Sequence, residues 1–128
     1  MNHENYLDKK QYDFGTIFYY SRYVVSKINL EYLVDTPTAA RILSDIDRFY
    51  QNQKFVYISN REIDHNVDLS IYKLVNPKKL IGIAIVCKER SKIKQVAAEQ
   101  KLYDGSFGFF KNMSSAIAWA QLLVEEHN

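Results

Sequence analysis

Five polar side chains follow the two most apolar segments of the chain, residues 55–59 and 80–86. They are Asn60, Arg61, Lys88, Glu89 and Arg90. If both segments are neighbouring parallel strands, their carboxyl ends meet where open α/β sheets usually bind ligands. Arg and Lys at that place would hold a carboxylate, a phosphate or an acidic loop of a partner protein. The alternative is that all five residues simply begin surface loops.

A second group of polar residues contains acid–base and metal-ligand types. Its members are Glu62, Asp64, His65 and Asp68. Metal sites need converging ligands at fixed spacing, and this run lacks the Gly and the terminal Glu of a calcium loop. One His without a nearby thiolate is also a weak zinc signal. We therefore expect no metal, and a solvated loop that leads to Asp68 as a helix cap.

Catalytic and cofactor signatures are absent elsewhere in the chain. The basic neighbours of Cys87, the only cysteine, would favour its thiolate, but all three histidines are remote in sequence. A structural thiol is the expectation. The four glycines form neither a dinucleotide fingerprint nor a Walker loop. Gly82, inside an apolar segment, instead predicts the close approach of a helix. We expect no cofactor and no enzymatic activity.

Composition places the chain among ordinary globular domains. Its 128 residues are 47% hydrophobic and 25% charged, which predicts a single domain over residues 1–128. The N-terminal residues lack the pattern of a signal peptide, and no apolar stretch would span a bilayer, so a cytoplasmic location is expected. The net charge is +2, with basic residues concentrated between Lys73 and Lys111. These are not interleaved with aromatics, so nucleic-acid binding is not expected.

Periodicity and strand-forming residues predict five strands and four helices. The strands are expected at 12–20, 24–30, 55–59, 80–86 and 107–110, the first two as an antiparallel hairpin. The helices are expected at 36–50, 68–75, 90–102 and 113–124. Strands that alternate with helices indicate a mostly parallel sheet. The fold class is therefore α/β, in the order β-β-α-β-α-β-α-β-α.

Several residues define how the helices begin and which side they bury. Thr36 is expected to cap the first helix, with Pro37 at its first position. In the helix at 90–102, Ile93, Val96 and Ala97 are expected to face inward. Asn112 is expected to cap the last helix, whose predicted buried stripe is Met113, Ala116, Ile117, Ala120, Leu123 and Val124.

Three segments in this order resemble a known family. They are Lys54–Asn60, Lys79–Val86 and the closing stretch Phe109–Asn112 with Ala116–Ala120. The chain resembles the STAS-like superfamily, and more narrowly the small bacterial proteins with the fold of anti-sigma-factor antagonists. The resemblance covers nearly the whole chain. It implies a sheet wound as successive β-α turns and a family habit of protein–protein interaction, in some members of ligand binding.

The resemblance also allows one family motif to be tested against this sequence. Anti-sigma-factor antagonists carry a phosphorylatable Ser in an Asp-Ser-Ser-Gly-like motif, which is absent here. Ser70, after Asp68-Leu69, is the nearest candidate, so a phospho-switch is not expected. The leading interpretation is a non-enzymatic, regulatory interaction module with a protein partner. The alternative is a domain that binds a small molecule or lipid near Arg61 and Lys88.

A homodimer is a further expectation from the aromatic content. Residues 18–20 and Tyr23 are rich in aromatic side chains that suit an interface. If the helices gathered on one face of the sheet, these strands would offer a self-complementary surface for a twofold dimer. If the helices divide between both faces, that surface is covered within the chain.

Overall fold

The computed structural model describes residues 5–29, 33–61, 66–89 and 92–127. Its main sheet has six strands in the order β1-β2-β3-β5-β7-β8. The strands are β1 Asp8–Tyr12, β2 Gly15–Tyr19, β3 Tyr23–Ile28, β5 Phe55–Asn60, β7 Leu80–Val86 and β8 Ser106–Phe110. The pairs β1–β2 and β2–β3 are antiparallel, and the other pairs are parallel. The α/β class with an antiparallel N-terminal hairpin is confirmed.

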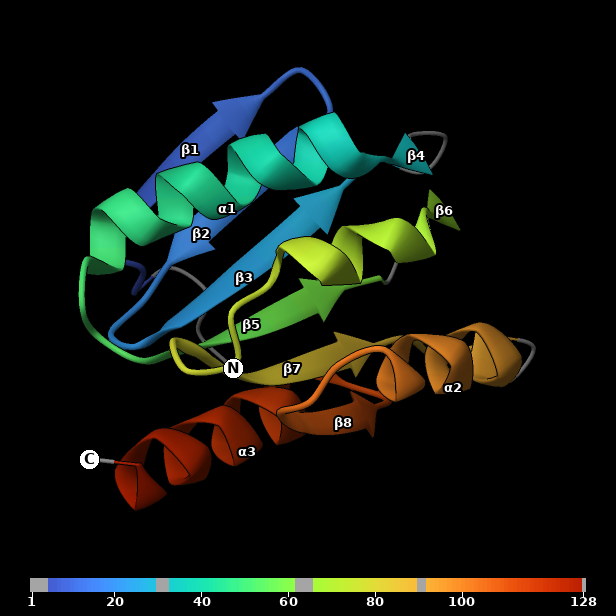
Figure 1. The fold of residues 1–128 in the computed structure, drawn as a ribbon. Helices are drawn as coiled ribbons and strands as arrows, with labels where there is room; N and C mark the ends of the chain where they lie inside the picture. Colours follow the sequence, from blue (N-terminus) through green and yellow to red (C-terminus); the bar gives the residue numbers. More distant parts are fainter. Residues whose placement is uncertain (1–4, 30–32, 62–65, 90–91, 128) are drawn as a thin grey trace.

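Helices lie on both faces of this sheet (Figure 1). They are α1 Thr36–Tyr50, the 3-10 helix η1 Leu69–Leu74, α2 Ile93–Lys101 and α3 Met113–Glu126. The first three each follow one strand and lead to the next in the sheet. Crossovers of one hand place such connections on one face, and the buried apolar residues of all three belong to one core cluster. Since α3 follows the last strand, it is free of this rule and covers the other face.

The division of helices removes the argument for an exposed aromatic face. Tyr20 and Tyr23 are buried, at 6% and 9% exposure, and their rings stack 4.6 Å apart. Both belong to the core cluster beneath α3. This aromatic surface is therefore used within the chain.

The N-terminal strands and a small second sheet differ from the expectation. The segment 12–20 forms no single strand, because Asp13 and Phe14 turn the chain between β1 and β2. The register pairs Tyr12 with Gly15, which has a positive φ of 156°. Two further strands, β4 Leu33–Val34 and β6 Asn66–Val67, pair in parallel outside the main sheet. Strands of two residues carry too little sequence pattern to be predicted.

The helix starts confirm two expected caps and correct one. Asp68 and Asn112 cap η1 and α3, each accepting a hydrogen bond from a backbone N–H inside the helix. The cap of α1 is Asp35, whose carboxylate accepts from Thr38 N at 3.0 Å. Thr36 is thus already helical, because a carboxylate is present one residue earlier.

The predicted buried side is correct for α3 and only partly correct for α2. All six residues of the predicted α3 stripe are buried. An added Cβ on Gly82 would lie 2.3 Å from Leu123 Cδ2 and 3.1 Å from the Trp119 ring, which confirms the expected close approach of a helix. In α2 the expectation is confirmed for Val96, which is 5% exposed, and wrong for Ile93, which is 49% exposed, and for Ala97, which is also exposed. The buried residues of α2 are Val96 and Glu99.

Candidate functional site

The carboxyl ends of β5 and β7 lie side by side, as the sequence predicts. Asn60 is in register with Val86, and Arg61 N donates to Val86 O at 2.8 Å. The five predicted site residues nevertheless separate. Asn60 and Arg61 are buried, at 8% and 4% exposure, whereas Lys88 and Glu89 are exposed. Arg90 lies outside the described residues. The carboxyl ends of these strands therefore bury Asn60 and the cation of Arg61 and leave Lys88 and Glu89 on the surface.

Arg61 is held by a carboxylate from a distant helix. Its Nη1 donates to Glu99 Oε2 and its Nη2 to Glu99 Oε1, both at 2.7 Å. Its Nε donates to Ser59 Oγ at 3.0 Å. Glu99 is fully buried, at 0% exposure, and also accepts from the Tyr72 hydroxyl at 2.7 Å. Arg61, Glu99, Tyr72 and Ser59 form what we call the buried ion-pair network.

Both ions of this network are removed from water. Each buried ion costs several kcal/mol of lost hydration, which two charge-assisted hydrogen bonds and the neutrality of the pair offset. The pKa of Tyr72 is raised by burial and then by the negative charge of Glu99. Tyr72 therefore stays protonated and keeps its hydrogen directed at the carboxylate. The network as a whole carries no net charge.

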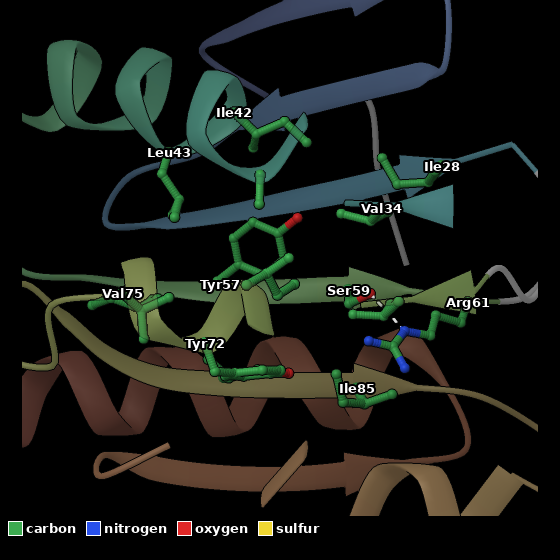
Figure 2. A pocket seen from close by; sticks show the side chains of 15 residues that line it. Ile28, Val34, Ile42, Leu43, Tyr57, Ser59, Arg61, Tyr72, Val75 and Ile85 are labelled. Atoms are coloured by element: carbon green, nitrogen blue, oxygen red, sulfur yellow. Dashed lines mark hydrogen bonds between the residues drawn. The ribbon is translucent and has the colours of Figure 1, made fainter. Parts of the chain in front are cut away.

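A pocket lies directly beside this network, between the sheet and the helices α1 and η1 (Figure 2). Its cavity volume is about 70 Å³. Fifteen residues line it: Ile28, Val34, Ala39, Ile42, Leu43, Tyr57, Ser59, Arg61, Val67, Ile71, Tyr72, Val75, Leu80, Ile83 and Ile85. Most of the wall is aliphatic. The polar groups come from Ser59, Arg61 and the two tyrosines, so the pocket has one polar region within an apolar wall.

Some residues that line the pocket are only partly buried, including one on the central strand β5. Tyr57 lies on β5 beneath the helices, yet it is only partly buried. Leu43 on α1 and Val75 after η1 also line the pocket and are partly buried. The gap between α1 and η1 thus remains incompletely filled by side chains. Ordinary cores have few voids larger than a water molecule, so this one is a candidate binding site.

A buried hydroxyl next to the pocket has no partner of its own. Ser26 lies on β3 in register with Ser59 and is 1% exposed. Within the described part of the chain, its Oγ makes no hydrogen bond of acceptable geometry. It lies close to the phenol of Tyr57, whose pKa is raised by burial and lowered in part by the Ser26 hydroxyl and by Arg61. Buried hydroxyls are normally satisfied, and the Tyr57 residue close to this one lines the pocket, whereas Ser26 itself does not.

Those of the remaining candidates that the structure describes, Asp68, Ser70 and Cys87, are not among the residues that line the pocket. Ser70 Oγ donates to Asp68 Oδ1 at 2.8 Å and lies 3.1 Å from Thr36 Oγ1, joining the starts of η1 and α1. Glu62, Asp64 and His65 lie outside the described residues. Among the described residues there is no group of three metal-ligand side chains. Cys87 is buried at 2% exposure.

The sequence did not reveal Glu99 as part of a site. A single Glu in a helix rich in Lys and Gln reads as a solvated residue, and a salt bridge 38 positions apart leaves no local pattern. The available signal was indirect. Arg61 follows a buried strand, and an inward-facing Arg requires a buried anion.

None of the helices in the described ranges has the length and apolar character needed to cross a bilayer. No protein-family model matches the chain. No curated protein matches it either.

One solved structure resembles the chain over most of its length. It is an uncharacterized protein from the DUF3478 family with a SpoIIAA-like fold, from Shewanella loihica PV-4. The two share 10% sequence identity, with a TM-score of 0.53, over 88% of this chain and 90% of that chain. At this identity the likeness concerns the fold alone. The element order, the mixed sheet and this likeness together show that the chain has a SpoIIAA-like fold.

Proposed function

We propose that this protein is a small-molecule binding domain that takes a largely apolar ligand into the pocket beneath α1 and η1. The observation that carries the proposal is a cavity of about 70 Å³ with aliphatic walls and a cluster of polar groups at one place. Ligand sites in general combine apolar walls with a few placed polar groups. The carboxyl end of β5 supplies these groups, at Ser59 and Arg61.

The size of the pocket limits the ligand. Its volume is roughly half that of the engineered 150 Å³ cavity that binds benzene in another protein. The cavity therefore holds only part of a six-carbon chain, and the rest of the chain would extend outward past the partly buried Leu43 and Val75. Hexan-1-ol is therefore a suitable probe for binding to this pocket.

Filling the cavity from α1 is expected to abolish this binding. Ala39 lines the pocket and is 5% exposed, so Ala39→Leu places three further carbons in the cavity. Stability should be unchanged or raised by about 0.5–2 kcal/mol, as for other cavity-filling changes. Saturable shifts of the Tyr57 and Ser59 amide signals with hexan-1-ol, measured by two-dimensional NMR, should occur in the unmodified protein and disappear in the variant.

Two matched Ala→Leu variants on α3 provide controls. Ala118→Leu lies on the exposed side of the helix and should leave both binding and stability unchanged. Ala120→Leu lies at a fully packed position with 0% exposure and should cost about 1–3 kcal/mol by overpacking. If Ala39→Leu is as destabilising as Ala120→Leu, the cavity does not exist. If the unmodified protein shows no saturable shift, the proposed function is wrong.

Self-association through β8 is a second candidate, in line with an interaction module. β8 is an edge strand whose residues Ser106–Phe110 carry no charge, and Phe109 is 38% exposed. The other edge, β1, carries three charged residues, which disfavour pairing. Two copies of β8 paired antiparallel about a twofold axis between Phe107 and Gly108 would place Asp104 of each copy opposite Lys111 of the other. We therefore propose a second copy of this chain as the occupant of the β8 edge.

A charge exchange tests that pairing. The molar mass measured by sedimentation equilibrium should rise with concentration for the unmodified protein. Asp104→Lys should weaken association because it places like charges opposite each other. The double change Asp104→Lys with Lys111→Asp should restore it. A monomer at all concentrations, or a double variant no better than the single one, would contradict this edge pairing.

A further inference from the structure

The pocket presents a cation whose charge is already neutralised. Arg61 lines the pocket, while Glu99 does not line it and lies behind the guanidinium with 0% exposure. Both terminal nitrogens of Arg61 donate to Glu99 at 2.7 Å. An arriving carboxylate would therefore meet a neutral pair, and its own charge would leave water without compensation.

A cationic head group meets the same difficulty. Arg61 reaches the pocket as half of a neutral pair, so the charge of an ammonium would also leave water without compensation. The carboxylate that might attract it is buried and already accepts hydrogen bonds from Arg61 and Tyr72. Neither sign of charge is matched by this arrangement.

Neutral polar groups, by contrast, find suitable partners. Ser59 Oγ lines the pocket and accepts from Arg61 Nε at 3.0 Å, and its own hydrogen remains available to a further acceptor. Tyr57 also lines the pocket and carries a second hydroxyl. Hydroxyls both donate and accept, so they suit an alcohol or a carbonyl oxygen equally well.

Resting on the proposed function, we infer that the pocket selects uncharged amphiphiles, with an alcohol or carbonyl head group at Ser59 and Tyr57, and excludes fatty acids and alkylamines. The Arg61–Glu99 pair is neutral as a whole, and it orients the Ser59 hydroxyl through the hydrogen bond from Arg61 Nε. Charge selectivity then belongs to Glu99, although that residue does not line the pocket.

Three six-carbon probes that differ only in the head group test this selectivity on the unmodified protein. Hexan-1-ol should bind at least about tenfold more tightly at pH 7 than hexanoate or hexylammonium, measured from the Tyr57 and Ser59 amide shifts. Hexanoate or hexylammonium binding as tightly as the alcohol would overturn the inference and leave the proposed function standing. No saturable shift with any probe would overturn the proposed function itself.

A variant pair assigns the selectivity to the ion pair. Glu99→Gln keeps the shape of the side chain but removes its charge, so a net cation lines the pocket, and hexanoate should become the preferred probe. Removing both charges with Arg61→Gln and Glu99→Gln should return the preference to hexan-1-ol. Spectral dispersion reports whether each variant is folded. A folded Glu99→Gln protein that still prefers the alcohol contradicts the inference, and the three-probe comparison decides it without any variant.

Discussion

Replacing Glu99 with glutamine is expected to lower the free energy of unfolding by about 3–5 kcal/mol, a large part of the stability of a domain of this size. The Arg61 guanidinium is 4% exposed and would lose the carboxylate that receives two of its hydrogen bonds. The amide also presents an NH₂ group to donors at one of those two positions. Urea unfolding followed by circular dichroism measures the loss.

A combined apolar replacement separates the net contribution of the ion pair to stability from the cost of leaving one of its ions unpaired. Arg61→Met, Glu99→Leu and Tyr72→Phe together remove both charges and the hydroxyl that donates to Glu99. Such replacements of buried ion pairs are often neutral, so most of the stability should return. On the surface, Arg48→Ala breaks a 3.5 Å contact to Asp45 from a side chain that is 76% exposed, and should change stability by less than about 1 kcal/mol. A loss below about 1 kcal/mol for Glu99→Gln would mean that the pair is hydrated.

Glu99 acts on a residue 38 positions away, and such distant contacts are the reason why the sequence predicts the fold better than the site. Leu80–Val86 is apolar at every position because it is covered on both faces, and such a run identifies a central strand by itself. The α3 stripe repeats at helical spacing because one neighbour, the sheet, buries it. In these elements, local pattern and tertiary environment agree.

The failures occur where a distant residue decides the outcome. The buried side of α2 contains Glu99, which reaches Arg61, beside the apolar Val96, while the apolar Ile93 remains exposed. Arg61 was correctly expected at the strand end, but its orientation depends on the same partner. A pocket is harder still, since it is the space that three elements leave between them. No residue pattern encodes that space.

Raising the pH above about 10 is expected to unfold this protein cooperatively, because buried tyrosines would be forced to ionise. Tyr50, Tyr72 and Tyr103 are 3%, 8% and 5% exposed. The pKa of each is raised by burial, and that of Tyr72 further by Glu99. Each hydroxyl donates inside the fold: Tyr50 to Tyr20 O and Tyr23 O at 2.6 and 2.7 Å, Tyr72 to Glu99, and Tyr103 to Leu80 O.

The direction follows from proton binding in the two states. Below pH 10 both states keep the phenolic protons, so these groups add no pH dependence. Above pH 10 the unfolded chain releases protons that the folded chain retains, and stability falls by about 1.4 kcal/mol per pH unit for each tyrosine. Three such tyrosines remove about 4 kcal/mol per pH unit. Unfolding is then expected within one to three units above pH 10, roughly where that loss equals the stability of a small domain.

Absorbance at 295 nm and circular dichroism recorded on one sample measure this transition. Tyrosinate should appear in step with the loss of helical signal, because ionisation of the buried groups requires unfolding. Tyr50→Phe removes one of the linked protons, so the slope of stability against pH above 10 should become shallower by about 1.4 kcal/mol per unit. Its stability at pH 7 should fall at the same time, since Tyr20 O and Tyr23 O both lose the hydrogen bond from the Tyr50 hydroxyl. Gradual ionisation with an unchanged helical signal would instead mean that these phenols reach water in the folded state, and that the core on the side of α1 and η1 opens far more readily than its burial implies.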